Sequence, residues 1–430
     1  MHFQCIYVEF LLAVDVGCLI CIPVWGTQVG SCGLECLTYG IWEAAHNQNA
    51  AISLLNRVCV TMFNQTYIHE NRWLKPIALG LTLGAALLWS SSSYALDKED
   101  LKVIPESDLP PKAEVMKQLN QQFPSEVVIP SYESLVEQMD TLVQATQRFE
   151  TQPTEQSLSA VHRAWLGAVS SWATSNAVAF GPVHSLGYST SLEFPTDATG
   201  IDTLLATEAE NFDGIALLPS LQGFEAMAYV LGSATDKTAA DFTERERRYL
   251  SALAVNAHAV AEDILQVWQV GWNNNPAYET LLSTAGQPGN SAYLSVEAGS
   301  EEIVRGIINS LDVVAAEELP LIVESLETNA EVPDEVTLQL LNSSLYGIQS
   351  AYLGTTVEQS AETAVGVSKL VAIANEDLNQ QIQTSLVAAI ASLEQAMAEP
   401  TNVQALATTQ QSLETAFTLL ETQVLPLVQR

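Results

Sequence analysis

The sequence predicts an all-α protein built of two helical bundles in tandem. Apolar residues recur at spacings of three and four over most of the chain after residue 130. Strand-like patterning is scarce and is found only around 127–130. Segments with Pro, Gly and Asn interrupt the helical stretches, and a broad one near 275–300 suggests a boundary. We therefore expect a first bundle domain at 130–285 and a second at 286–430.

The N-terminal part of the chain resembles a secretory signal peptide that begins at Met62. Arg72 and Lys75 precede an apolar run from 76 to 89, and a small-x-small site ends at Ala95. The apolar run is too short to span a bilayer comfortably. We therefore predict a signal peptide at 62–95, cleavage after Ala95, and a mature chain without a transmembrane helix.

Residues 1–61 differ in composition from the rest of the chain. All six cysteines lie there, and none follows Cys59. The favoured interpretation is a spurious upstream extension from a misplaced start. The alternative is a membrane-associated leader, because residues 10–25 are largely apolar, although Asp15 interrupts the run.

The charge balance is strongly acidic. The chain has 50 Asp and Glu against 16 Lys and Arg, with a formal net charge of −34. Such a field repels nucleic acids and attracts cations and cationic partners. Solubility outside the cytoplasm explains most of the charge. We expect a periplasmic or secreted protein, with peripheral attachment to a membrane left open and no nucleic-acid partner.

The elements of the first bundle follow from caps and apolar periodicity. Residues 96–129 are expected to be an irregular lead-in with one short helix at 112–122. Pro153-Thr154 marks a helix start, and Thr243 and Glu246 have capping-box spacing ahead of a second helix, which 273–279 ends. The expected core positions of these two helices are Leu158, Val161, Trp165, Ala168, Trp172, Leu250, Leu253, Ala257, Val260, Ile264 and Val267.

The second bundle is expected to contain helices at 301–318, 334–353, 357–398 and 402–424. The stretch 357–398 is too long for one ordinary helix, so we expect a break near 375–379.

Catalytic and phosphate-binding motifs are scarce after residue 95. No HExxH, GxSxG or phosphate-binding loop follows the predicted cleavage site. His162, His184 and His258 are far apart, and we interpret each as structural. The irregular stretch 179–233 is the best candidate for lining a site, and it contains the acids Glu193 and Asp197.

Five segments, in the expected order, resemble the imelysin family of M75-type peptidases, which includes the iron-regulated protein A group. They cover roughly 130–430. They are "AWLGAVSSWATSNAVAFGPV" (164–183), "LEFPTDATGIDTLL" (192–205), "LQGFEAMAYVLGS" (221–233), the helix at 242–268, and "LYGIQSAYLG" (345–354).

The sequence departs from the family pattern at positions that matter chemically. Where the family has Gly-x-His-x-x-Glu, Gly223 is kept, Glu225 takes the His position and Ala228 takes the Glu position. Asn176 stands where the family has a Glu, and Phe194 where it has a Trp. A methyl group cannot ligate a metal or move a proton, so the motif is degenerate and we name no catalytic residue.

Three interpretations of Glu225 remain open at this point. Leu221, Phe224, Met227 and Leu231 form the core stripe of its helix, and Glu225 lies about 100° round from Phe224. The three interpretations are a solvated edge residue, a polar contact across the bundle interface, and a ligand contact. A buried and unpaired carboxylate would be costly.

The resemblance implies a role in iron acquisition in the bacterial envelope. Our first hypothesis is a non-enzymatic protein that binds a metal ion, a metal complex or an envelope partner between the bundles. The candidate ligand-binding residues are Glu225, Asn176, Asp197 and Glu193. No cofactor is certain, and iron or another divalent or trivalent cation is the candidate. A structural or interaction module with a decayed site is the alternative, and a metallopeptidase ranks below both.

Overall fold

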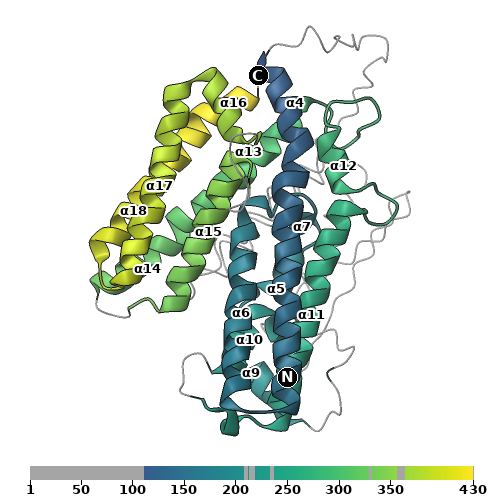
Figure 1. Ribbon diagram of the computed structural model, residues 1–430, viewed down its shortest axis with the longest axis vertical. Coiled ribbons are helices and arrows are strands. Elements are labelled where there is room, and N and C mark those ends of the chain that lie inside the picture. Colours follow the sequence, from purple (N-terminus) through teal and green to yellow (C-terminus); the bar gives the residue numbers. More distant parts are fainter. Residues whose placement is uncertain are drawn as a thin grey trace, which may run out of the picture. The chain divides into compact units, whose positions relative to one another are not determined.

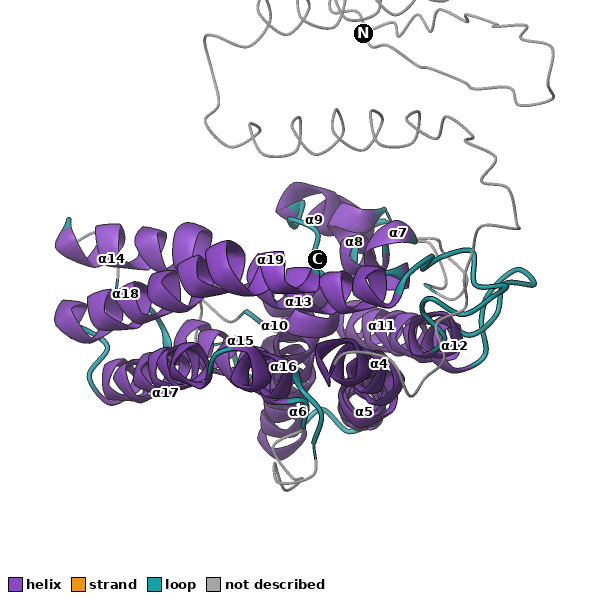
Figure 2. Cartoon of the chain, turned by 90° about the horizontal axis from the view of Figure 1, so that it is seen from above, coloured by secondary structure: helices purple, strands orange, loops and turns teal. Residues whose placement is uncertain are grey.

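The computed structural model describes residues 111–207, 212, 218–232, 237–328, 332–355 and 364–429. These residues are helical almost throughout, and no strand occurs among them (Figure 2). The all-α prediction is confirmed. The predicted upstream extension, the signal peptide, the cleavage site after Ala95 and residues 96–110 lie outside the described residues.

The described chain begins with a continuous helical rod (Figure 1). It consists of α4 (Pro111–Phe123), the π-helical turn η3 (Pro124–Val128) and α5 (Ile129–Thr151). The short helix expected at 112–122 is confirmed, whereas the lead-in is helical, not irregular, from Pro111 on. The strand-like patterning around 127–130 does not produce a strand, because these residues belong to η3 and the start of α5. Val127 and Val128 are buried in a helical turn, and the helices on both sides override their strand propensity.

Two long helices pack against α5, as Figure 1 shows. They are α6 (Glu155–Ser175) and α11 (Glu244–Gln269). The Thr154 side chain caps α6, and the predicted capping box at Thr243 and Glu246 is present at α11. All predicted core positions of both helices are buried except Val260, which is half-buried.

Short helical elements occur in the described parts of the connection between α6 and α11, and most of them lie in the stretch 179–233 that the sequence marked as irregular. They are η4 (Asn176–Val178), α7 (Pro182–Ser185), α8 (Tyr188–Leu192), α9 (Ala198–Ala206), η5 (Pro219–Leu221), α10 (Gly223–Leu231) and η6 (Ala239–Asp241).

The C-terminal half is also helical. Its elements are α12 (Tyr278–Ser283), α13 (Val296–Asp312), η7 (Val313–Glu318), α14 (Leu319–Glu327), α15 (Glu335–Leu353), α16 (Val367–Ala374), α17 (Glu376–Ala398), α18 (Val403–Leu419), η8 (Leu420–Val424) and α19 (Leu425–Val428). The break expected near 375–379 is confirmed, because α16 ends before Asn375 and the Asn375 side chain caps α17.

The helices of the two halves meet where α15 crosses α6. Gly347 permits this crossing, since a Cβ atom there would lie 2.0 Å from the Thr174 carbonyl oxygen. The buried apolar residues on both sides form one continuous core. The division into two bundle domains near residue 285 stays a prediction. Within the described residues, no helix is both long enough and apolar enough to cross a membrane.

Candidate functional site

The degenerate motif lies at the start of α10, where the glycine has a clear structural role. Gly223 has a φ of 83°, a conformation that favours glycine. A Cβ atom at this position would lie 2.4 Å from the Leu192 carbonyl oxygen. Gly223 thus lets α10 begin directly against the backbone that leads into Glu193.

Three polar contacts hold the beginning of α10 in place. The indole N–H of Trp165 donates to the carbonyl of Phe224 (3.2 Å), and the Tyr249 hydroxyl donates to the carbonyl of Leu221. The Asn256 side chain donates to the Gln222 side chain (2.8 Å). Helices α6 and α11 therefore position the motif through side chains far from it in sequence.

Glu225 is exposed and bound to the neighbouring loop. Its Oε2 atom accepts the backbone N–H of Thr196 (3.1 Å). Tyr229, one turn further along α10, donates its hydroxyl to Asp202 (2.8 Å). Glu225 therefore combines solvent exposure with a polar contact to the loop that follows Glu193. Ala228 leaves the motif's second position without a polar side chain.

Glu193 lies between α8 and the loop that Glu225 binds. Its side chain reaches solvent on one side, while protein surrounds the rest. Burial raises the pKa of Glu193 to about 7, and the negative charges of Glu318 and Glu225 add to this shift. The Trp172 indole N–H acts in the opposite direction and lowers the pKa. It does not reach the geometry of a regular hydrogen bond, so this support for the anion is weak.

Glu318 comes to the same place from the second half of the chain. It is the last residue of the π-helical turn η7, and its side chain is exposed. Burial of part of the side chain and the adjacent Glu317 raise its pKa to about 7. Short π-helical turns inside longer helices are frequent at functional sites. The sequence analysis missed Glu318, although the Glu-Glu-Leu-Pro run at 317–320 is a usable signal.

We call Glu193, Glu225 and Glu318 the acidic cluster. Glu193 interacts electrostatically with both other members, which come from α10 and η7. No basic side chain of the described residues is among the groups that shift the pKa of Glu193 or Glu318. Like charges without a cation repel one another, so a bound positive charge would be stabilised here.

The donor set does not fit a directly coordinated metal at this cluster. Across the part of the chain that the structure describes, no three His, Cys, Asp or Glu side chains are grouped closely enough to hold a metal ion. Ala228 has no ligating side chain, and Asn176 offers an amide and not a carboxylate. The residues present therefore suit electrostatic binding and not a peptidase metal centre.

The remaining predicted site residues have other surroundings. Asp197 caps α9, where its Oδ1 accepts the backbone N–H of Gly200 (2.9 Å). Asn176 is half-buried at the start of η4, which packs against α13 and α15.

The three histidines stand apart from the cluster. His162 is half-buried, and burial lowers its pKa. His184 is exposed. His258 lies 3.2 Å from Asp140 and 3.5 Å from Glu262 through its two ring nitrogens.

Comparison with known proteins places the chain in a family. The imelysin (peptidase M75) family model matches residues 128–424. The iron-regulated protein A of Synechococcus elongatus is 31% identical over 329 residues, which cover 74% of this chain and 88% of that protein.

Two solved structures share the fold. One is a putative iron-regulated protein A precursor from Parabacteroides distasonis, with a TM-score of 0.62, 18% identity, and coverage of 74% of this chain and 96% of that one. The other is an imelysin-like protein from Psychrobacter arcticum, with a TM-score of 0.60, 17% identity, and coverage of 75% and 97%. The family resemblance inferred from the sequence is confirmed, and the chain belongs to the imelysin family.

Proposed function

We propose that this protein is an exported, non-enzymatic imelysin whose acidic cluster binds a positively charged ligand in the context of iron supply. The ligand class is a hydrated multivalent cation or a cationic metal complex. The link to iron comes from the related Synechococcus protein, which is named iron-regulated protein A.

The raised pKa values of Glu193 and Glu318 are the observation that supports the proposal most. Both carboxyls have a pKa of about 7, and both side chains reach solvent. A bound cation would offset the lost hydration and, at Glu193, the repulsion from Glu225 and Glu318. A positive charge bound at the acidic cluster would therefore stabilise the ionised carboxylates.

A peptidase reaction finds little support in the same residues. Metal-assisted hydrolysis needs about three protein ligands and a bound water. The degenerate motif supplies Glu225 but no second ligand at Ala228. A decayed site that serves only structure is the competing function, because Glu225 and Asp197 both make local backbone contacts.

Binding of cobalt(III) hexaammine tests the proposal, because this ion exchanges its ligands too slowly to be chelated and reports electrostatic binding alone. Calorimetry at low salt would compare the wild type with the double variant Glu193→Gln/Glu318→Gln. The matched control is Glu414→Gln/Glu421→Gln, which removes two exposed charges from α18 and η8.

We expect the cluster variant to bind about tenfold more weakly, a difference of about 1.4 kcal/mol, and the control to lose much less. Equal affinity of the wild type and the cluster variant, or an equal loss in the control, would support the decayed-site alternative.

A further inference from the structure

A second group of oxygen donors lies apart from the acidic cluster, around Tyr278, Tyr293 and Glu302. The two phenol oxygens are 2.6 Å apart. The Tyr278 oxygen lies 3.2 Å and 3.4 Å from the two carboxylate oxygens of Glu302, and the Tyr293 hydroxyl donates to Glu302 as well. Three side chains from three elements of the fold therefore converge on one point.

The packing around Tyr278 fixes its phenol. Its ring meets Trp268 edge to face, with centroids 4.9 Å apart. Gly181 also packs against the phenol of Tyr278, since a Cβ atom at Gly181 would be 2.6 Å from the Tyr278 hydroxyl oxygen. The backbone N–H of Gly181 also stabilises the Glu302 carboxylate.

The backbone at Tyr293 is held from both directions. Its N–H donates to the Asn290 side chain (2.8 Å), and its carbonyl accepts the N–H of Gly286 (3.0 Å). The Asn290 side chain in turn donates to the Leu281 carbonyl at the end of α12 (2.6 Å). The donor oxygens therefore do not depend on a loose loop for their position.

We propose that Tyr278, Tyr293 and Glu302 form a binding site for a hard trivalent cation of the ferric type. Phenolate and carboxylate oxygens are hard donors of the kind that such ions prefer. Two phenolates and one carboxylate carry three negative charges, which match the charge of the ion. The three side chains are hydrogen-bonded to one another, and the ion would take the place of the two phenol protons in these contacts.

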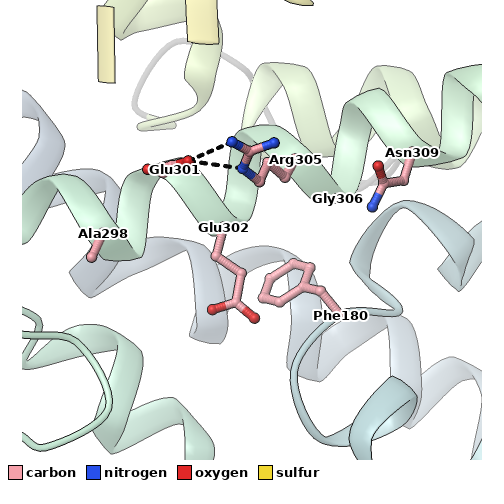
Figure 3. A pocket seen from close by; sticks show the side chains of 7 residues that line it. All are labelled: Phe180, Ala298, Glu301, Glu302, Arg305, Gly306 and Asn309. Atoms are coloured by element: carbon pink, nitrogen blue, oxygen red, sulfur yellow. Dashed lines mark hydrogen bonds and ion pairs between the residues drawn. The ribbon is translucent and has the colours of Figure 1, made fainter. Parts of the chain in front are cut away.

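A pocket beside Glu302 gives solvent a route to this carboxylate, and the two tyrosines are not among the residues that line it. Its volume is about 380 Å³, and Glu302, Phe180, Arg305 and Gly306 are among the residues that line it. In Figure 3 Glu302 projects from α13 on the side where Phe180 of a neighbouring loop lies, while Arg305 reaches toward Glu301 (2.7 Å). Arg305 is thus engaged with Glu301, and water in the pocket would complete the coordination.

Binding must displace two protons. Burial and the neighbouring negative charge of Glu302 raise the pKa of both phenols, so both are protonated at neutral pH before a metal arrives. On binding, each phenol O–H bond is replaced by a metal–oxygen bond and its proton passes to solvent. Affinity therefore increases with pH.

The competing explanation is a purely structural network that ties α12 and the following loop to α13. Spectroscopy separates the two, because only bonds from phenolate to ferric iron give a charge-transfer band in the visible region. Iron on surface carboxylates does not give this band, however acidic the protein is.

The experiment is a titration of the folded protein with ferric nitrilotriacetate at pH 7.5, followed by visible absorption. We expect a saturable band at one equivalent. Tyr278→Phe and Tyr293→Phe should each weaken it at least about tenfold in apparent affinity, and the double variant should abolish it. Tyr346→Phe is the matched control, since its hydroxyl bonds a single carboxylate, Glu394 (3.0 Å), and it should leave the band unchanged.

If the wild-type protein shows no charge-transfer band, that result alone overturns the proposal. A band that survives in the folded double variant would overturn it as well, with folding checked by circular dichroism. The result is independent of the acidic cluster, because cobalt(III) hexaammine cannot bond to phenolates and Glu193→Gln/Glu318→Gln leaves both tyrosines in place.

Discussion

The backbone N–H of Thr196 donates to the carboxylate of Glu225, at 3.1 Å. Glu225 therefore holds the loop that follows Glu193. This contact connects the motif helix α10 to the acidic cluster, and it gives Glu225 a role that needs no metal.

Removing the Glu225 carboxylate should release this loop. For Glu225→Ala we expect faster hydrogen exchange at the Thr196 amide and a loss of about 1 kcal/mol in the free energy of unfolding. Glu225→Gln keeps an acceptor oxygen and should retain most of the protection. Exchange rates at Thr196 that are the same in all three proteins would contradict the assigned role.

The pH dependence of stability should reflect Glu193 and Glu318. Each has a folded pKa of about 7, above the ordinary value of 4.5, so the folded state binds more protons than the unfolded state between these values. Their contribution is therefore most favourable at low pH and is lost as pH rises from 4.5 to 7.

Urea unfolding of Glu193→Gln and Glu318→Gln at pH 5 and pH 8 checks this sign. Relative to the wild type, both variants should gain more stability at pH 8 than at pH 5. Glu414→Gln, which removes an exposed charge on α18, should show no such difference. A larger gain at pH 5 would show that the sign is wrong.

The crossing of α6 and α15 should tolerate no side chain at Gly347. A Cβ atom there would meet the Thr174 backbone oxygen at 2.0 Å, so Gly347→Ala should lower the free energy of unfolding by about 2 kcal/mol. Gly167→Ala, also within a helix, would meet only the flexible Gln138 side chain. That variant should be neutral or more stable by up to about 1 kcal/mol. Chemical denaturation measures the free energy of unfolding of both variants. Equal changes in the two variants would contradict the close contact between Gly347 and Thr174.

The capping box of α11 should contribute measurably to stability. The Thr243 hydroxyl accepts the Glu246 N–H (3.2 Å), and the Glu246 carboxylate accepts the Thr243 N–H (2.7 Å). Thr243→Ala should cost about 1 kcal/mol in the free energy of unfolding. Thr141→Ala, on an exposed face of α5, should change it much less. A thermal melt that ranks the two variants the other way would argue against the cap.

Local sequence signals predicted the helices well where they were strong. Thr243 with Glu246, and Asn375 between two helical stretches, mark element ends by side-chain hydrogen bonds that the sequence itself specifies. Val127 and Val128, where the pattern is most strand-like, lie buried in a helical turn, because tertiary packing overrides their strand propensity.

The site was less accessible from sequence. Glu193 and Glu225 come from the region that the sequence singled out, but Glu318 lies more than ninety residues further along the chain. Only the packed structure brings it into electrostatic range of Glu193. The same holds for Tyr278, Tyr293 and Glu302, which no sequence motif connects. The tyrosines lie in a segment that the sequence identified only as a boundary.

Proton release on cation binding at pH 7 tests the central claim most directly. At this pH Glu193 and Glu318, with pKa values of about 7, are each about half protonated. Calorimetry with cobalt(III) hexaammine in two buffers of different ionisation enthalpy should show release of up to about one proton per bound ion. The release should disappear in Glu193→Gln/Glu318→Gln. Binding without proton release, or the same release in the double variant, would contradict the account.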